Sequence, residues 1–175
     1  MTHAAGVLVE NIDLLLNLPH QFGVLDLACG NGRNGLLLAR EGVPVTFADS
    51  DQTKIENIEK TLAQENLPGR GWWIDLELDG NSPLEEKCFN ACLVFNYLYR
   101  PGLNSLKRSI VSGGLVYYET FTLENRKYGR PSNTDFLLQP GELAREFEGW
   151  DVLHYFEGEL KNPDRAIANI IARKP

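Results

Sequence analysis

The stretch that decides the fold is Val24-Leu-Asp-Leu-Ala-Cys-Gly-Asn-Gly-Arg33. It begins with an apolar run that holds one acid, Asp26, and such runs are typical of a strand covered on both faces of a parallel sheet. Gly30 and Gly32 permit a tight turn directly afterwards, and residues 34–41 have the composition and spacing of a helix. The N-terminus of that helix would offer unpaired N–H groups and positive potential. The stretch therefore predicts a strand, a turn and a helix that together hold an anionic group.

The remaining chain repeats the alternation of strand and helix, which is typical of parallel strands joined by right-handed crossovers. Further strands are predicted at 44–48, 71–75, 89–95, 113–121, 150–156 and 166–172, and further helices at 52–66, 101–109 and 140–147. The last two strands have no helix between them, and strands joined by a loop run antiparallel. We therefore predict an α/β fold with a doubly wound, Rossmann-like, seven-stranded sheet. This sheet is mostly parallel, with one antiparallel strand near the C-terminus and helices on both faces.

The 175 residues, of which 43% are apolar, are enough to enclose one core, so we expect a single domain over residues 1–175. Residues 1–20 are predicted to hold an N-terminal packing helix, because apolar residues recur at helical spacing between Ala4 and Leu18. Residues 122–138 have little periodicity and follow a strand of the parallel sheet. Long loops at that end of a sheet usually form sites, so this segment is a candidate active-site loop.

The formal net charge of −7 disfavours nucleic acid and anionic membranes as partners, because both repel an acidic protein at long range. The sequence has no apolar run of about eighteen residues and no signal peptide at its N-terminus, so we expect a cytoplasmic protein with no membrane partner. Three cysteines are present without the Cys/His spacing of a metal site, and no metal is expected. The sequence leaves both a monomer and a homodimer open.

The glycine pattern Gly30-x-Gly32-x-x-Gly35 also fits a dinucleotide-binding fingerprint, and an acid, Asp49, ends the second strand as that fingerprint requires. Asp26 separates the two interpretations. A pyrophosphate has no use for a carboxylate at this place, whereas a ligand with an α-ammonium group and a sulfonium presents positive charge to it. We therefore interpret the turn as a site for a positively charged sulfur nucleoside.

Residues 24–33 resemble the first motif of class I S-adenosylmethionine-dependent methyltransferases, and later segments follow that family's order. The resemblance implies S-adenosylmethionine as cofactor, with S-adenosylhomocysteine as its product. It also implies that Asp49 bonds both ribose hydroxyls and that Asp75 and Leu76 contact adenine, although an aspartate after a strand can equally cap the next element. The implied cofactor-binding residues are Asp26, Ala28, Gly30, Asn31, Gly32, Arg33, Asp49, Ser50, Asp75, Leu76 and Asn96.

A closer resemblance is to the tellurite-resistance, TehB-like subgroup of small bacterial methyltransferases. Residues 29–34 and 38–39 match its first motif, and residues 141–145 and 148–150 match its C-terminal helix and the strand that follows. The chain departs from this subgroup where the acceptor would bind, since Lys161 stands where a histidine is expected. The resemblance therefore implies the donor site and leaves the acceptor open.

The segments at 96–101, 118–121 and 130–138 instead resemble those of another set of bacterial methyltransferases, in which a histidine stands at the position of Tyr99. The first two of these segments lie at the ends of the fourth and fifth strands, where open α/β sheets bind ligands. The candidate catalytic residues are Glu119, Tyr97 and Tyr99, and the candidate substrate-binding residues are Arg100, Thr120, Arg126, Arg130 and Asn133. The loop residues among them would clamp an anionic acceptor. The alternatives are that the two tyrosines are packing residues, that Arg100 pairs with an acid, and that the loop charges are solvated.

These inferences lead to one function, an S-adenosylmethionine-dependent methyltransferase that acts on a small-molecule acceptor by in-line methyl transfer. A sulfonium donor is already activated, so the enzyme contributes mainly alignment and exclusion of water. A protein or nucleic-acid methyltransferase is the first alternative, which acidity and size disfavour. The second alternative is a protein that binds S-adenosylmethionine without catalysis.

Overall fold

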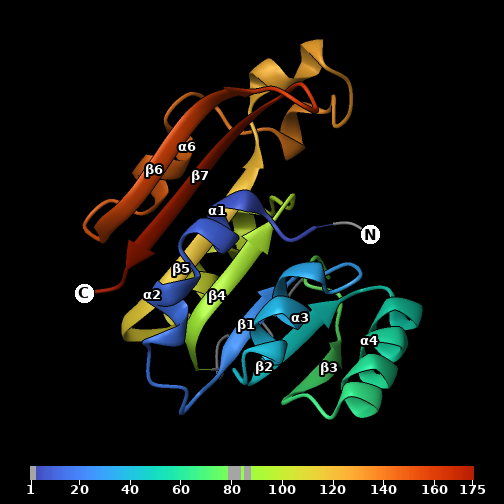
Figure 1. Cartoon of the computed structure of the whole chain (residues 1–175). Coiled ribbons are helices and arrows are strands. Elements are labelled where there is room, and N and C mark those ends of the chain that lie inside the picture. The colour runs from blue at the N-terminus through green and yellow to red at the C-terminus, as the bar shows by residue number, and fades with distance from the viewer. Residues whose placement is uncertain (1–2, 79–83, 85–87) are drawn as a thin grey trace.

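A seven-stranded sheet forms the centre of the computed structural model, which describes residues 3–78, 84 and 88–175. The strand order is β3-β2-β1-β4-β5-β7-β6 (Figure 1). The strands are β1 (Val24–Leu27), β2 (Val45–Asp49), β3 (Gly69–Trp73), β4 (Phe89–Phe95), β5 (Ile110–Phe121), β6 (Asp151–Leu160) and β7 (Arg165–Arg173). The first five strands pair in parallel, and β7 is antiparallel to both of its neighbours. The predicted fold class, including the single reversed strand, is therefore confirmed.

Helices cover both faces of this sheet. They are α1 (Gly6–Glu10), α2 (Ile12–Leu16), α3 (Arg33–Arg40), α4 (Gln52–Glu65), α5 (Leu103–Ser109) and α6 (Glu142–Glu146), with 3-10 turns η1 (Arg100–Gly102), η2 (Leu123–Lys127) and η3 (Thr134–Phe136). The first four helices bury their apolar side chains on one face, which is turned to the viewer in Figure 1. The second apolar cluster, on the opposite face, includes residues of α5 and α6. Among the described residues no helix is long and apolar enough to cross a membrane.

The N-terminal segment differs from the single helix expected within residues 1–20. It forms two short helices that are interrupted at Asn11, whose φ of −124° is not helical. The buried hydroxyl of Tyr117, on β5, donates a 2.7 Å hydrogen bond to the carbonyl of Asn11. The prediction of one continuous helix was therefore wrong, and local periodicity carries no information about a contact with a residue so distant in the sequence.

Three strands have bounds that differ by more than one residue from those predicted, and among them β6 continues to Leu160 rather than ending at residue 156. The third strand begins at Gly69 rather than at residue 71, and Gly69 stands opposite Val45 in the register with β2. This strand lies at the edge of the sheet and is partly exposed, so its first residues carry no apolar pattern. The fifth strand begins at Ile110 rather than at residue 113 and bends where its register with β4 shifts, between Phe89 and Ala91.

The crossovers determine where a site can form. From β1 the chain winds through α3 and α4 toward β3, whereas from β4 it winds through α5 toward β5 on the other side of the sheet. Open α/β sheets bind their ligands at such a switch point, at the carboxyl ends of the two strands. The relevant strand ends here are those of β1 and β4, which are neighbours.

Candidate functional site

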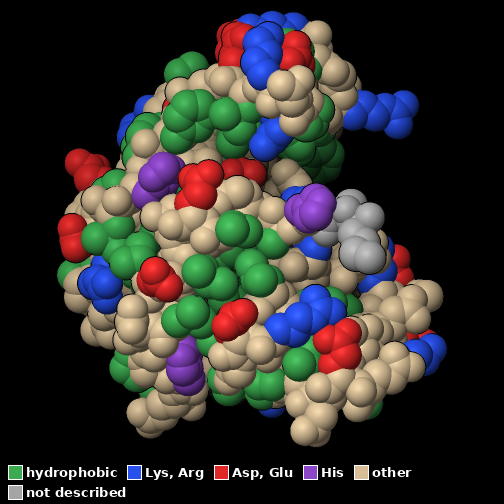
Figure 2. Space-filling view, in the orientation of Figure 1, with side chains coloured by type: hydrophobic (Ala, Val, Ile, Leu, Met, Phe, Trp, Pro, Cys, Tyr) green, Lys and Arg blue, Asp and Glu red, His purple; other side chains and the backbone are tan. Residues whose placement is uncertain are grey.

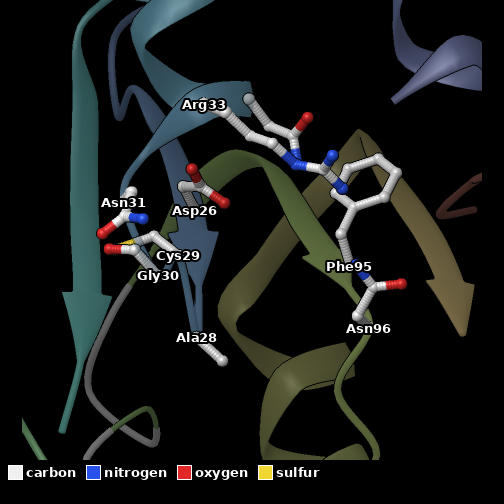
Figure 3. Close-up of a pocket in the computed structure, with 9 residues that line it drawn as sticks. Asp26, Ala28, Cys29, Gly30, Asn31, Arg33, Phe95 and Asn96 are labelled. Atoms are coloured by element: carbon white, nitrogen blue, oxygen red, sulfur yellow. The ribbon is translucent and has the colours of Figure 1, made fainter. Parts of the chain in front are cut away.

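A cavity of about 360 Å³ opens at this switch point (Figure 3). Its walls come from the end of β1, the turn that follows, the start of α3 and the end of β4. The lining residues are Asp26, Ala28, Cys29, Gly30, Asn31, Arg33, Asn34, Phe95 and Asn96. The volume lies within the range of about 300–1,000 Å³ that small-molecule sites occupy. Six of the predicted cofactor residues therefore meet around one cavity.

The backbone of the turn adopts conformations that bring main-chain groups to the cavity. Gly30 has φ +56°, and a Cβ added to it would meet no atom within 4 Å, so the space in front of it is open to a ligand. Ala28 and Asn96 have positive φ values of 51° and 57° although neither is glycine. Such residues cluster at ligand sites, because the surrounding structure must hold them in an unfavourable conformation.

Asp26 is the buried acid of the cavity. Its side chain points to the face covered by α1–α4 and is only 2% exposed, and its Oδ2 accepts a 2.9 Å hydrogen bond from the amide of Gly35. Burial raises the pKa of Asp26 to about 7, and the nearby Asp49 carboxylate adds to the increase, while the Gly35 amide and Arg33 oppose it. A cation placed beside this carboxyl would favour its ionised form. The site therefore matches a positively charged group.

Asp49 connects the end of β2 to the glycine turn. Its Oδ2 accepts a 2.7 Å hydrogen bond from the amide of Gly30, and its Oδ1 accepts one of 3.0 Å from the amide of Asp51. The carbonyl of Asp49 also accepts from the amide of Ile74, which brings the segment after β3 alongside. This carboxylate therefore lies between the turn and the segment that carries Asp75 without itself lining the cavity.

The remaining predicted cofactor residues flank the cavity. Gly32 is the N-cap of α3 in a left-handed conformation, and Leu76 is half-buried against the second apolar cluster. The carboxylate of Asp75 accepts a 2.9 Å hydrogen bond from the amide of Glu77, as expected of a residue that caps the following turn. The indole of Trp73 is 60% exposed and donates a 3.1 Å hydrogen bond to the carbonyl of Ser50.

Two cavity residues, Asn34 and the predicted cofactor residue Arg33, anchor the N-terminal segment. The carboxamide of Asn34 accepts a 2.9 Å hydrogen bond from the amide of Ala5. The guanidinium of Arg33, which reaches toward the ring of Phe95 in Figure 3, donates to the carbonyl of His3. Residues 3–5 therefore lie beside the N-terminus of α3. Three lining residues, Cys29, Asn34 and Phe95, were not among the predicted site residues. Cys29 and Asn34 lie within the glycine-turn motif and Phe95 ends a predicted strand, and these positions were the signal available in the sequence.

The predicted acceptor residues at the end of β4 lie away from the cavity. Arg100 is held in a bidentate ion pair with Glu142 on α6, and it also donates to the carbonyls of Asp135 and Leu137. The alternative that Arg100 pairs with an acid is therefore confirmed. Tyr97 packs against the second apolar cluster, and burial together with its contact to Glu77 raises the pKa of its hydroxyl well above the usual range. Tyr99 is half-buried.

Backbone hydrogen bonds join the two ends of the candidate loop at 122–138. The amide of Leu123 donates to the carbonyl of Leu138, and the amide of Leu138 donates to the carbonyl of Phe121. The side chains of Arg126 and Arg130 are exposed, and that of Asn133 caps η3. None of these three lines the cavity of about 360 Å³. The loop instead contributes to a second cavity, of about 230 Å³, between η2 and β6.

Glu119, at the end of β5, belongs to a chain of polar side chains that crosses three strands. Its Oε2 accepts a 3.0 Å hydrogen bond from the carboxamide of Asn169 on β7, and the Asn169 Oδ1 lies 2.9 Å from Nε2 of His154 on β6. Glu119 and Asn169 are 8% and 6% exposed. The neighbouring Thr120 is buried at 1% exposure. Sequence reasoning missed Asn169, and its signal was a single amide inside the otherwise apolar run of β7.

Comparison with known proteins finds similarity to methyltransferases. A family model described as "Tellurite resistance protein TehB" matches residues 15–173. A "Probable S-adenosyl-L-methionine-dependent methyltransferase TehB" from Haemophilus influenzae is 27% identical over 165 residues, which cover 86% of this chain. The match spans 57% of that relative's length.

Solved structures share the fold. The crystal structure of TehB from Haemophilus influenzae matches with a TM-score of 0.78 at 22% identity, over 100% of this chain and 64% of that one. The magnesium protoporphyrin IX methyltransferase from Synechocystis PCC 6803, solved with bound S-adenosylhomocysteine, matches with a TM-score of 0.70 at 13% identity, over 97% of this chain and 80% of that one.

Proposed function

Because the chain belongs to the TehB family, we propose that it binds S-adenosylmethionine at the cavity between β1 and β4 and transfers the methyl group to a small-molecule acceptor. Because the match spans 57% of the length of that relative, the proposal depends on the chain's own residues. The observation that carries it is the buried carboxyl of Asp26 beside a turn whose backbone is open to a ligand.

The residues present suit such a cofactor. The Asp26 carboxyl would hold the α-ammonium group, and the backbone around Gly30 would take the carboxylate, because left-handed turns at a helix N-terminus present amides to anions. Asp49 would hold the ribose hydroxyls, and the segment at Asp75 and Leu76 would take the adenine. A pyrophosphate would place negative charge against Asp26, and repulsion disfavours a dinucleotide here.

When bound, the cofactor would supply a methyl group carried on a sulfonium sulfur. The sulfur-containing part of the cofactor is a good leaving group because it departs as a neutral thioether. The protein's part is to align an acceptor with that methyl group and to keep water out. Such alignment supplies roughly 7–11 kcal/mol of a reaction barrier. Phe95, which is buried, and Asn96, whose backbone is held by the carbonyl of Glu119, form the wall of the cavity that would face the acceptor.

Calorimetric titration of the full chain tests the proposal directly. We expect saturable binding of S-adenosylmethionine and S-adenosylhomocysteine, and no binding of NAD⁺. Binding of NAD⁺ in their place would replace the proposal with a dinucleotide site. Turnover is then measured as production of S-adenosylhomocysteine with candidate small acceptors. Cofactor binding without turnover on any acceptor would favour the non-catalytic alternative.

A further inference from the structure

The polar chain His154–Asn169–Glu119 has a fixed direction. A carboxylate only accepts hydrogen bonds, so the Asn169 Nδ2 must be the group that donates to Glu119 Oε2. The Asn169 Oδ1 then faces His154 and can only accept, which requires Nε2 of the imidazole to carry a proton. Each side chain thereby fixes the orientation of the next. His154, which lies two strands away on β6, thereby orients the Glu119 carboxylate through Asn169.

Glu119 stands beside the cofactor cavity. Its Cα is the register partner of Phe95, a lining residue, and neighbouring strands lie about 4.8 Å apart. Its side chain shares the sheet face of Tyr117, because alternate residues of a strand point to one face, and Asp26 lies on that face too. The carbonyl of Glu119 accepts from the amide of Asn96, which ties the two strand ends together. The carboxylate is thus one strand beyond the wall that would face the acceptor.

One oxygen of this carboxylate is available. Oε2 is taken by Asn169, whereas Oε1 accepts no hydrogen bond from the described part of the chain and is not fully enclosed. Glu119 also belongs to none of the ion pairs between described residues, whose acidic partners are Asp51, Glu65, Glu124, Glu142, Glu146, Glu159 and Asp164. A nearly buried carboxylate with amide partners alone is incompletely stabilised.

Among the described residues, acidic groups outnumber basic ones around the cavity, since Arg33 is the one cation that lines it and its guanidinium donates to the carbonyl of His3. Figure 2 shows this face of the molecule, on which basic side chains are dispersed among acidic and apolar ones and form no cluster near its centre. The two cations whose positions resemble family sites, Arg100 and Lys161, are each paired with an acid. An oxyanion acceptor would therefore meet the carboxyl groups of Glu119 and Asp26 against the single guanidinium of Arg33.

We infer that Glu119 Oε1 binds the acceptor, that Asn169 and His154 are positioning residues for it, and that the acceptor is an amine. This inference rests on the proposed function. The amine would arrive as an ammonium ion paired with the carboxylate. Because a desolvated ion pair is costly, one proton passes to Oε1 and leaves a nitrogen lone pair. That lone pair forms the new bond to the methyl carbon while the carbon–sulfur bond breaks and its electron pair stays on sulfur. The carboxylic proton is released to water with the product.

The first experiment measures acceptor binding without turnover. The full chain is saturated with S-adenosylhomocysteine, and saturation-transfer NMR is recorded with ethylamine, butylamine, benzylamine and phenethylamine, with the alcohol and carboxylate of each carbon skeleton, and with selenite in competition. We expect amines to bind in preference to their alcohols and carboxylates, and selenite not to displace them. A chain that binds S-adenosylhomocysteine and takes no amine, or prefers the anions, overturns this inference and leaves the proposed function standing. Failure to bind S-adenosylhomocysteine removes the proposed function itself.

The second experiment assigns the binding to Glu119. In Glu119→Gln we expect amine affinity to fall by about tenfold or more, equivalent to about 1.4 kcal/mol. The control Glu148→Gln removes the same charge from an exposed side chain and should keep amine affinity. Equal amine affinity in the two variants contradicts the assignment. Affinity for S-adenosylhomocysteine and thermal melting, measured on both, separate a local effect from misfolding.

The third experiment tests the positioning residues. Long-range nitrogen–proton NMR of the His154 ring should show a proton on Nε2. His154→Gln places an amide donor near the Nε2 position and should retain amine affinity, whereas His154→Phe and Asn169→Leu should lower it about as much as Glu119→Gln does. A proton on Nδ1 alone, or equal amine affinity in the Gln and Phe variants, contradicts the role of His154.

Discussion

The amide of Gly35 donates a 2.9 Å hydrogen bond to Oδ2 of Asp26, and a Cβ at Gly35 would lie 2.8 Å from that same oxygen. One glycine of helix α3 thus holds the buried acid of the cavity, and its lack of a side chain permits the approach. The same Cβ would come within 2.4 Å of the ring of Phe47, which is fully buried. The third glycine of the turn motif is therefore required by packing as well as by the site.

Replacement of Gly35 by alanine should destabilise the protein although alanine is the better helix former. The gain in helix propensity is about 1 kcal/mol. Overpacking a buried position typically costs about 1–3 kcal/mol, and the backbone and the Phe47 ring leave little room to relax here. We expect a lower urea midpoint in Gly35→Ala. Gly6→Ala is the matched control in helix α1, where the Cβ would meet its nearest atom at 3.9 Å, and it should be neutral or stabilising.

Asp26 should make the stability of the free protein depend on pH. Its pKa is about 7 in the folded chain against an ordinary value of 3.8, so the folded state keeps a proton that the unfolded state has lost between these values. Stability therefore falls as the pH rises from about 4 through 7, by at most roughly 4 kcal/mol. Asp26→Asn keeps an acceptor for the Gly35 amide without a charge. Urea unfolding at pH 5 and pH 8 should show a smaller loss in the variant than in the unmodified chain, and parallel curves would exclude this role.

Asp49 should be needed for the cofactor, because its carboxylate holds the amide of Gly30 and would accept from the ribose hydroxyls. Hydrogen bonds to charged groups contribute about 1.5–3 kcal/mol each, so we expect Asp49→Ala to weaken binding of S-adenosylmethionine by about tenfold or more in calorimetry. Asp51→Ala is the control, since this side chain caps helix α4 through the amide of Lys54. It should lower the melting temperature and keep cofactor affinity. Equal cofactor affinities in the two variants would refute the assignment of Asp49.

Arg100 should act on stability rather than on acceptor binding. Its guanidinium joins Glu142 to the carbonyls of Asp135 and Leu137, so Arg100→Ala releases the end of the 122–138 segment from helix α6. We expect a loss of about 1–2 kcal/mol, after allowance for the partly exposed guanidinium. Hydrogen exchange at Leu137 should become faster. The exposed Arg126→Ala should change neither measurement, and a similar effect in both would mean that the ion pair is not the cause.

The fold followed from local patterns because each pattern has a local physical cause. Strands β1 and β4 are apolar throughout since both faces of a parallel sheet are covered, and the absence of a helix between β6 and β7 forced their antiparallel pairing. The glycine turn could also be predicted from the sequence, because glycine is the residue that most readily adopts positive φ angles. The break at Asn11 could not be predicted from local patterns, and the hydroxyl that bonds the Asn11 carbonyl comes from Tyr117 on β5.

The sequence by itself determined the sheet, its one reversed strand and the place of the cavity, because periodicity and turn chemistry act between residues close along the chain. Only the tertiary structure decided the partners of the charged and polar side chains. It paired Arg100 with Glu142, and it joined Glu119, Asn169 and His154 across three strands. Hydrogen bonds and ion pairs depend on distances of about 3 Å between atoms, and strand order sets those distances rather than separation along the chain.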